Sequence, residues 1–204
     1  MAEKKLENVQ MGYTWTSYIA AVEGALQHAG LWQGETWKLM GMTGIGFHFI
    51  LHREICPSSV TVYDWTSDHL GAMDRIGIHS QVYSAMDFRM NTFGKIREDA
   101  IRLIQQSILK DRPVLVWAPT RLLEFGLITG FDDADGVFFV RDCTGQPCDP
   151  LLYTNLGLSE VPMLFYQIFH EKVDVNPEKI FHDSLLYGIS EWDKTYHMSP
   201  DFDS

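Results

Sequence analysis

A hairpin pattern near the middle of the chain constrains the fold most. Residues 124–142, EFGLITGFDDADGVFFVRD, form two apolar runs around an acidic turn. Gly136 suits the positive backbone angle that a tight hairpin turn requires, and we expect it to oppose Asp132. That register brings Glu124 and Asp142 to diagonal places on one face, roughly 5–8 Å apart. A bulge at Gly136 would shift the register and separate the two acids. The segment therefore predicts an antiparallel ribbon with a carboxylate near each open end.

The rest of the chain supplies helices first and strands later. Apolar residues at helical spacing predict helices, and short apolar or alternating runs predict strands. The glycine-rich stretch 35–49 indicates a short helix that runs into a loop. This order favours an α+β fold with an N-terminal helix packed on a late antiparallel sheet. The expected helices are 16–29, 69–76, 95–110 and 177–193, and the expected strands are 59–65, 79–85, 113–119 and 163–169.

Two segments differ in their expected part in the domain organisation. Residues 1–172 contain all the predicted strands and are long enough to form one well-packed domain. Residues 173–204 follow the last strand and contain one helical pattern, with Pro177 suited to its first turn. We therefore expect one α+β domain at 1–172 and a C-terminal helical extension at 173–204.

Charge and cysteine content exclude several classes of partner. The net charge of −11 disfavours nucleic acids and anionic membranes, whose phosphates would be repelled. No apolar run is long enough to cross a bilayer, and the first ten residues lack the apolar core of a secretory signal. Three cysteines do not make a disulfide framework. These features favour a cytoplasmic protein whose ligand is a small molecule or a peptide, and homo-oligomers remain open.

No pattern in the sequence predicts a metal or another cofactor. His48 and His52 share a helical spacing, but FHFILH lacks the glutamate of a metalloprotease helix, and its aromatic residues favour core packing. The aspartates of the hairpin turn lack the later ligands of a calcium loop. Cys143 and Cys148 are too few to hold zinc. We expect neither a metal nor a cofactor.

The hairpin and the first helix together resemble papain-like cysteine peptidases of the bacteriocin-processing C39 type. In that family the hairpin opens with a histidine and contains a Gly–x–Asp step, matched here by Gly130 and Asp132, before a strand that ends in an acid, matched by Asp142. KDRPVLVWAP resembles the segment that precedes this hairpin. More narrowly, ETWKLMGMTGIGFHF followed by CPSSVTVYDW is similar to a subgroup that includes butirosin-biosynthesis acyltransferase N-terminal domains. The likeness covers about residues 12–170 and implies a papain-like fold.

The resemblance also implies where a site would lie. The family places its catalytic cysteine thirteen residues before the glycine that ends the first helix. That position is Ser17 here, and Glu124 stands where the histidine would be. A papain-type site needs a thiolate paired with an imidazolium. Ser17, Glu124 and Asp142 therefore mark the ancestral triad positions, without the usual nucleophile and base.

Three hypotheses follow from this replacement. The first is a diverged, non-peptidase member of the superfamily that binds a peptide or a small amine-bearing metabolite in the ancestral cleft. The second is a hydrolase or acyltransferase with Ser17 as nucleophile, Glu124 as base and Asp142 as orienter. The third is a protein-interaction scaffold that uses the final helix. Each residue also has a plainer interpretation, because a serine in the first helical turn satisfies a backbone amide.

The ancestral cleft also predicts residues that would line a ligand. Aromatic side chains near the first helix, the glycine-rich loop and the hairpin are candidates for its walls. For each of them a buried core aromatic is the simpler interpretation and the one that the residue type favours. The candidates are Trp15, Phe47, Trp117 and Phe125.

Overall fold

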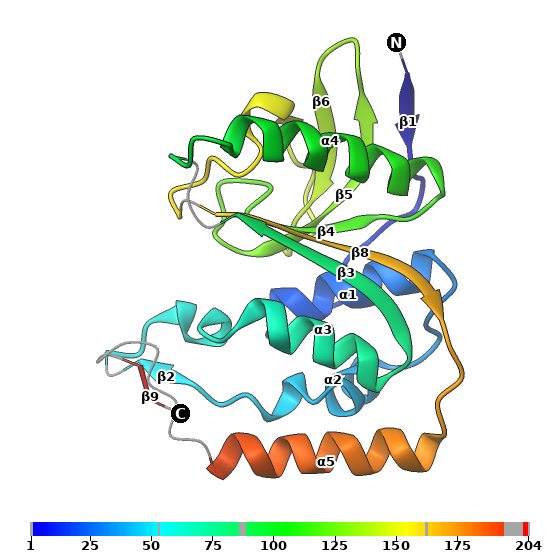
Figure 1. The fold of residues 1–204 in the computed structure, drawn as a ribbon, viewed down its shortest axis with the longest axis vertical. Coiled ribbons are helices and arrows are strands. Elements are labelled where there is room, and N and C mark those ends of the chain that lie inside the picture. The colour runs from blue at the N-terminus through cyan, green and yellow to red at the C-terminus, as the bar shows by residue number, and fades with distance from the viewer. Residues whose placement is uncertain (1, 53, 86–88, 162, 194–201, 204) are drawn as a thin grey trace. The chain divides into compact units, whose positions relative to one another are not determined.

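The computed structural model describes residues 2–52, 54–85, 89–161, 163–193 and 202–203. These residues form a mixed α+β structure with five α-helices and an antiparallel sheet of seven strands (Figure 1). The α+β class predicted from the order of elements is confirmed. The helices are α1 (Ser17–His28), α2 (Thr36–Thr43), α3 (Trp65–Arg75), α4 (Phe93–Leu109) and α5 (Pro177–Asp193). The strands are β1 (Glu3–Lys5), β2 (Leu51–His52), β3 (Ile78–Ala85), β4 (Val114–Trp117), β5 (Phe125–Asp132), β6 (Val137–Arg141), β7 (Leu151–Leu152), β8 (Leu164–Lys172) and β9 (Phe202–Asp203).

The chain divides into two compact units. Unit 1 comprises residues 1–33 and 80–170, and unit 2 comprises residues 34–79 and 171–204. Strands β3 and β8 run across the sequence boundaries between the units. The separate extension expected at 173–204 stays a prediction, and its residues 194–201 and 204 lie outside the described part of the chain.

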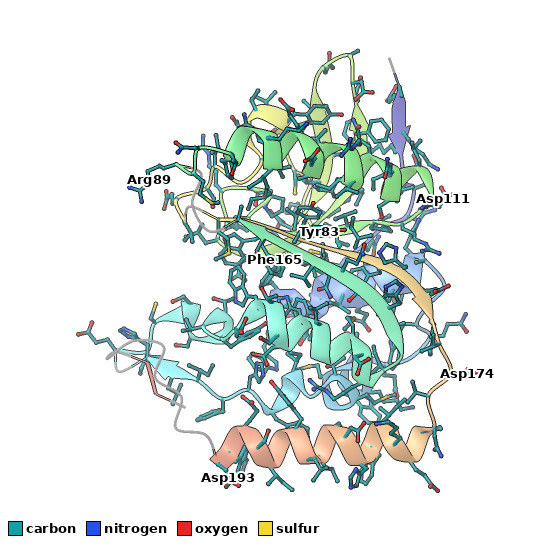
Figure 2. All side chains as sticks on the ribbon, in the orientation of Figure 1. Tyr83, Arg89, Asp111, Phe165, Asp174 and Asp193 are labelled. Atoms are coloured by element: carbon teal, nitrogen blue, oxygen red, sulfur yellow. The ribbon has the colours of Figure 1, made fainter. Side chains whose placement is uncertain are left out.

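Unit 1 is built on the large sheet, whose strand order is β3-β8-β4-β5-β6-β7, with β1 added beside β5. Strand β4 and all but the last residue of β5 are buried, which indicates that both faces of these strands are covered. Helices α1 and α4 both pack on β4 and β5, and Figure 1 shows them on either side of β4. Phe165 of β8, labelled in Figure 2, belongs to the same buried layer and packs edge-to-face on Phe125.

Helix α1 lies deep in unit 1. Every residue from Ser17 to Leu26 is buried, including the polar Ser17 and Glu23, and most of the others are apolar. Gly24 has no room for a side chain, since an added Cβ would lie 2.1 Å from the Gln10 carbonyl oxygen. The helix ends as expected, with Gly30 at a φ of 69° just after the cap. Tight burial on all sides fixes the position of its first residue, Ser17.

Unit 2 contains three helices that contact one another, and Figure 1 shows α5 running beside α2 and α3. Helix α2 ends at Gly44, whose φ of 79° is the left-handed turn favoured by glycine. Strand β2 pairs with β9 in a separate two-stranded ladder. The predicted short helix in 35–49 and the predicted final helix at 177–193 are thus confirmed.

Two sequence expectations are wrong. The predicted strand at 59–65 is instead a 3-10 helix, Pro57–Thr61, followed by the start of α3. Asp64 explains the difference, because its carboxylate accepts the backbone amides of Thr66 and Ser67 and caps α3. The register expected at the hairpin turn is also wrong, because Asp132 pairs with Val137 and not with Gly136. Strand β1, which pairs with β5, was not predicted.

Candidate functional site

The first turn of α1 and the start of β5 meet at Ser17 and Glu124. The Ser17 hydroxyl donates a hydrogen bond to Glu124 Oε2 at 2.5 Å. The same hydroxyl oxygen accepts the backbone N–H of Phe125 at 3.1 Å. Ser17 is the first residue of the helix, where unpaired amides create partial positive charge. The arrangement holds a carboxylate, a hydroxyl and an amide donor together at a helix N-terminus.

Backbone contacts between β4 and β5 hold Glu124 in place. The Ala118 amide, one residue after β4, donates to the Glu124 carbonyl at 2.9 Å. Ala118 has a φ of 47°, a left-handed conformation that turns the chain sharply at the end of the strand. The next residues form a loop that returns to Glu124, whose side chain is half-buried. The glutamate therefore stands at the rim of the sheet, with its backbone fixed.

The hairpin brings Asp142 to the same end of the sheet as Glu124. Leu127 pairs with Arg141, which agrees with the predicted register at this end, and Asp142 directly follows the last residue of β6. Gly126 is required there, because an added Cβ would lie 2.4 Å from the Arg141 carbonyl oxygen and 2.6 Å from Pro119. The predicted turn differs in detail, since Asp132 pairs with Val137.

Asp142 forms its own hydrogen-bond cluster. Its carboxylate accepts Thr120 Oγ1 at 3.1 Å, Thr144 Oγ1 at 2.6 Å and the Thr144 amide at 3.0 Å. Burial raises the pKa of Asp142, but hydrogen bonds from Thr144 and Thr120 outweigh it and hold the pKa below the ordinary value. Among the described residues, the hydrogen bonds of Asp142 thus go to these threonines and to the Cys148 thiol. The carboxylate is ionised at neutral pH and stabilises the turn formed by residues 142–144.

The Cys143 thiol interacts electrostatically with both Glu124 and Asp142. Its pKa is raised, first by burial and then by the negative charges of Glu124 and Asp142. The two carboxylates therefore contribute to one negative region at the open end of the hairpin. A raised pKa leaves less of the thiol as the nucleophilic thiolate at neutral pH, and Cys143 follows β6, whereas the resemblance would require a cysteine at the start of α1.

The predicted aromatic walls separate into three groups. Trp15, two residues before Ser17, is 56% exposed and available to a ligand. Trp117 and Phe125 are buried and pack edge-to-face at 5.0 Å, so they form the core beneath the site. Phe47 belongs to unit 2, where it packs against Gly188 of α5. Only Trp15 of the four has both a place next to Ser17 in the sequence and a largely exposed ring.

A second polar cluster lies in unit 2 around two histidines. The Tyr187 hydroxyl hydrogen-bonds to His48 Nε2 and donates to Asp68 Oδ1 at 3.0 Å. Glu191 Oε2 lies 3.8 Å from His48 Nε2. His69 is fully buried and shares a hydrogen bond with the Tyr63 hydroxyl at 3.0 Å. Burial, followed by the nearby His48, holds the pKa of His69 well below its usual range.

Metal-binding clusters and membrane-spanning helices are both absent from the described residues. No group of three or more His, Cys, Asp or Glu side chains suited to a metal occurs in residues 2–52, 54–85, 89–161, 163–193 and 202–203. Over the same described ranges, no helix is both long and apolar enough to span a bilayer. His48, considered above as a metal ligand, lies instead in the polar cluster with Tyr187.

Comparison of the chain with protein-family models, with curated proteins and with solved structures gave no match.

Sequence reasoning missed two parts of this geometry. The amide of Phe125 has no sequence signal, because any residue supplies a backbone N–H. The loop around Asp142 does carry one: in Asp142–Cys143–Thr144 the aspartate accepts the amide two residues on, which is a common turn of this residue type. The spacing of Asp142 and Thr144 would therefore have predicted that the Asp142 side chain stabilises this turn in addition to ending the hairpin.

Proposed function

We propose that residues 12–170 form a diverged member of the papain-like superfamily that binds a peptide or a small amine-bearing metabolite at Ser17 and Glu124 of unit 1. The resemblance of residues 12–170 to that superfamily supports the proposal, as does the order of a buried helix followed by a hairpin. The proposal does not include cysteine-peptidase activity, because the positions that match the catalytic cysteine and histidine hold Ser17 and Glu124.

The observation that carries this proposal is the Glu124 carboxylate beside Ser17. An ionised carboxylate has about four lone-pair positions, and the Ser17 hydroxyl takes one of them. In the described part of the chain, Glu124 forms no ion pair with a lysine or arginine. A primary ammonium group has three N–H donors and the complementary charge. Glu124 thus suits an amine, and Asp142 adds to the local negative charge.

The exposed ring of Trp15 suits the rest of such a ligand. An indole face attracts cations and also packs on apolar groups. Trp15 lies close in sequence to Ser17 and is largely exposed. An amine with an apolar or aromatic body would use both features, with its charge at Glu124 and its body near Trp15.

Calorimetric titration with free and blocked amines tests the proposal. The probes are 2-phenylethylamine and the amide of glycylglycylphenylalanine, each paired with its N-acetylated form. Glu124→Gln keeps the shape but removes the charge, so amine binding should weaken about tenfold to a hundredfold. Glu160→Gln, at an exposed position of unit 1, is the matched control and should bind as the wild type does. Equal binding of the acetylated probes, or no effect of Glu124→Gln, contradicts amine recognition by Glu124.

A second candidate function is acyl transfer or hydrolysis with Ser17 as the nucleophile. It is favoured by the Ser17 hydroxyl, which already donates to Glu124 at a distance suited to general-base catalysis. The Phe125 amide would stabilise negative charge on the Ser17 oxygen. One observation favours binding over catalysis: Asp142, the expected orienting acid, accepts hydrogen bonds from Thr120 and Thr144.

A fluorophosphonate probe separates the two functions, because it labels an activated serine covalently. Catalysis predicts labelling of the wild type and loss of labelling in Ser17→Ala. Absence of labelling at every pH from about 4 to 8, on both sides of the ordinary carboxyl range, would contradict the catalytic candidate and leave the binding proposal in place.

A further inference from the structure

A glutamine and a tyrosine form a hydrogen-bonded pair in the apolar core of unit 1. Gln167 is fully buried in β8, although residues 164–169 of this strand are otherwise aliphatic or aromatic. Its Oε1 accepts the Tyr18 hydroxyl of α1 at 3.2 Å, and its Nε2 donates to Ser80 Oγ of β3 at 3.0 Å. Burying an amide costs free energy unless it is hydrogen-bonded, so an apolar residue would be the simpler choice at position 167. We call Tyr18 and Gln167 the core pair.

Tyr18 links the core pair to the candidate site. It directly follows Ser17 in the first turn of α1 and is fully buried. Its ring packs edge-to-face on Phe125, with the ring centres 5.6 Å apart. The amide of the same Phe125 donates to the Ser17 hydroxyl oxygen. Two consecutive residues of α1 therefore contact one residue of β5, and any rotation of the first turn would change both contacts.

Strand β8 contacts Tyr18 and Phe125 through one of its faces. Residues two apart in a strand point to the same side of the sheet, so Phe165 and Gln167 share a face. Phe165, labelled in Figure 2, packs on Phe125 with ring centres 5.9 Å apart, and Gln167 bonds to Tyr18. These four side chains form a closed set of contacts that joins the first turn of α1 to β5 and β8.

A directional contact is useful here because most of α1 is apolar. Hydrophobic burial has no preferred direction, whereas a hydrogen bond depends steeply on distance and angle. Buried polar networks for this reason help to specify one packing arrangement of a core. The contact between Ser17 and Glu124 is itself a hydrogen bond, so it requires an accurate orientation of the helix.

We propose that Gln167 is a positioning residue of the candidate site. Through the Tyr18 hydroxyl it orients the first turn of α1, so that Ser17 Oγ meets both the Glu124 carboxylate and the Phe125 amide. The importance of this orientation for ligand binding rests on the proposed function. The orientation itself is measured in the free protein, so its failure can be distinguished from a failure of amine binding.

NMR of the Phe125 amide tests the proposal, because its proton lies in the hydrogen bond to Ser17. Ser17→Ala gives the position of this resonance when the bond is absent. Tyr18→Phe keeps the ring and removes the hydroxyl, and Gln167→Met keeps the side-chain length and removes both hydrogen bonds. In each of these two variants the resonance should move toward its position in Ser17→Ala. The Phe125 amide should also exchange about tenfold faster relative to the amides of β4.

Ser107→Ala is the matched control. Ser107 is a buried residue of α4 in unit 1, and its hydroxyl donates to the Arg112 carbonyl oxygen at 3.0 Å. The variant removes one hydrogen bond from the same unit but in a different helix. The Phe125 resonance should therefore keep its wild-type position in Ser107→Ala.

The double variant Tyr18→Phe/Gln167→Met tests whether the two residues act together. Both single changes remove the same hydrogen bond, so the double variant should move the resonance little further than Gln167→Met does. Full additivity would overturn the proposal, because the two residues would then act separately.

Two further results would overturn it. One is a Phe125 resonance that keeps its wild-type position in Tyr18→Phe, which is the milder change and decides the outcome if Gln167→Met does not fold. The other is an equal movement of the resonance in Ser107→Ala, which would show a general loosening of unit 1.

Discussion

The two units of this chain are stabilised in different ways. Unit 1 buries strands β4 and β5 between helices, and its central contacts are apolar, such as those of Phe125 and Phe165. Unit 2 is a small group of helices in which hydroxyl, imidazole and carboxylate groups meet around Tyr187. Both units thus have buried apolar residues, such as Phe131 in unit 1 and Leu39 and Met73 in unit 2. Unit 2 adds to these a polar cluster that includes the fully buried His69.

The largest effect expected from this difference is in the core of unit 1. Phe131 of β5 is 1% exposed, and Phe131→Ala should lower the free energy of unfolding by about 3–5 kcal/mol. Phe49→Ala replaces an exposed ring of unit 2 and should change it by no more than about 0.5 kcal/mol. Urea unfolding measures both variants. Similar losses for the two would contradict the burial of Phe131 in the core of unit 1.

A smaller effect is expected at the centre of unit 2. Tyr187→Phe keeps the ring but removes the hydroxyl that joins His48 and Asp68, which should cost about 1–3 kcal/mol. Hydrogen exchange followed by mass spectrometry locates the change. Exchange should accelerate in α2, α3 and α5 and stay constant in β4 and β5. Uniform acceleration through both units would show that they unfold together.

The smallest expected effect is a pH dependence confined to unit 2. The pKa of His69 is lowered in the folded state by burial and by His48. Below the unfolded value, near 6.5, the unfolded chain binds a proton that the folded chain does not. Stability from this group is therefore complete above that pH and falls below it, by up to about 1.4 kcal/mol per pH unit.

Urea unfolding between pH 8 and about 5, the range around an ordinary histidine pKa, measures this dependence. His69→Gln keeps a hydrogen-bonding partner for Tyr63 without a titrating group, so its stability should fall less in acid. An identical pH dependence in the wild type and in His69→Gln would rule out His69 as the source.

The sequence predicted much of the fold because the strongest signals were local. Periodicity located α1, α4, α5 and the hairpin, and Gly136 has the predicted positive φ of 64°. Its limits lie in long-range contacts. A bulge between Ile128 and Gly130 shifts the ladder by one residue and offsets the error made at the turn. At Gly130 an added Cβ would lie 2.6 Å from the Lys4 carbonyl oxygen, and that contact with β1 has no signal in the hairpin itself.

The site was predictable only in part. The resemblance predicted that Ser17 and Glu124 lie close together, because they stand at two matching positions of that family. The hydrogen bond between the two side chains agrees with this prediction. The Asp142 carboxylate also accepts a hydrogen bond from Thr120. Thr120 is distant in the sequence, so this contact cannot be inferred from spacing. Burial of Trp117 and Phe125 follows from the two helices that cover the sheet, which residue type alone does not specify.

Carbon-13 NMR of the side-chain carboxylates during titration with 2-phenylethylamine tests the central claim most directly. The Glu124 resonance is assigned by its absence in Glu124→Gln. If Glu124 recognises an amine, this resonance should shift in a saturable way, and N-acetylated 2-phenylethylamine should leave it unchanged. The claim would be contradicted if the Glu124 resonance did not shift at any amine concentration. It would also be contradicted if other signals shifted to saturation while the Glu124 resonance stayed fixed.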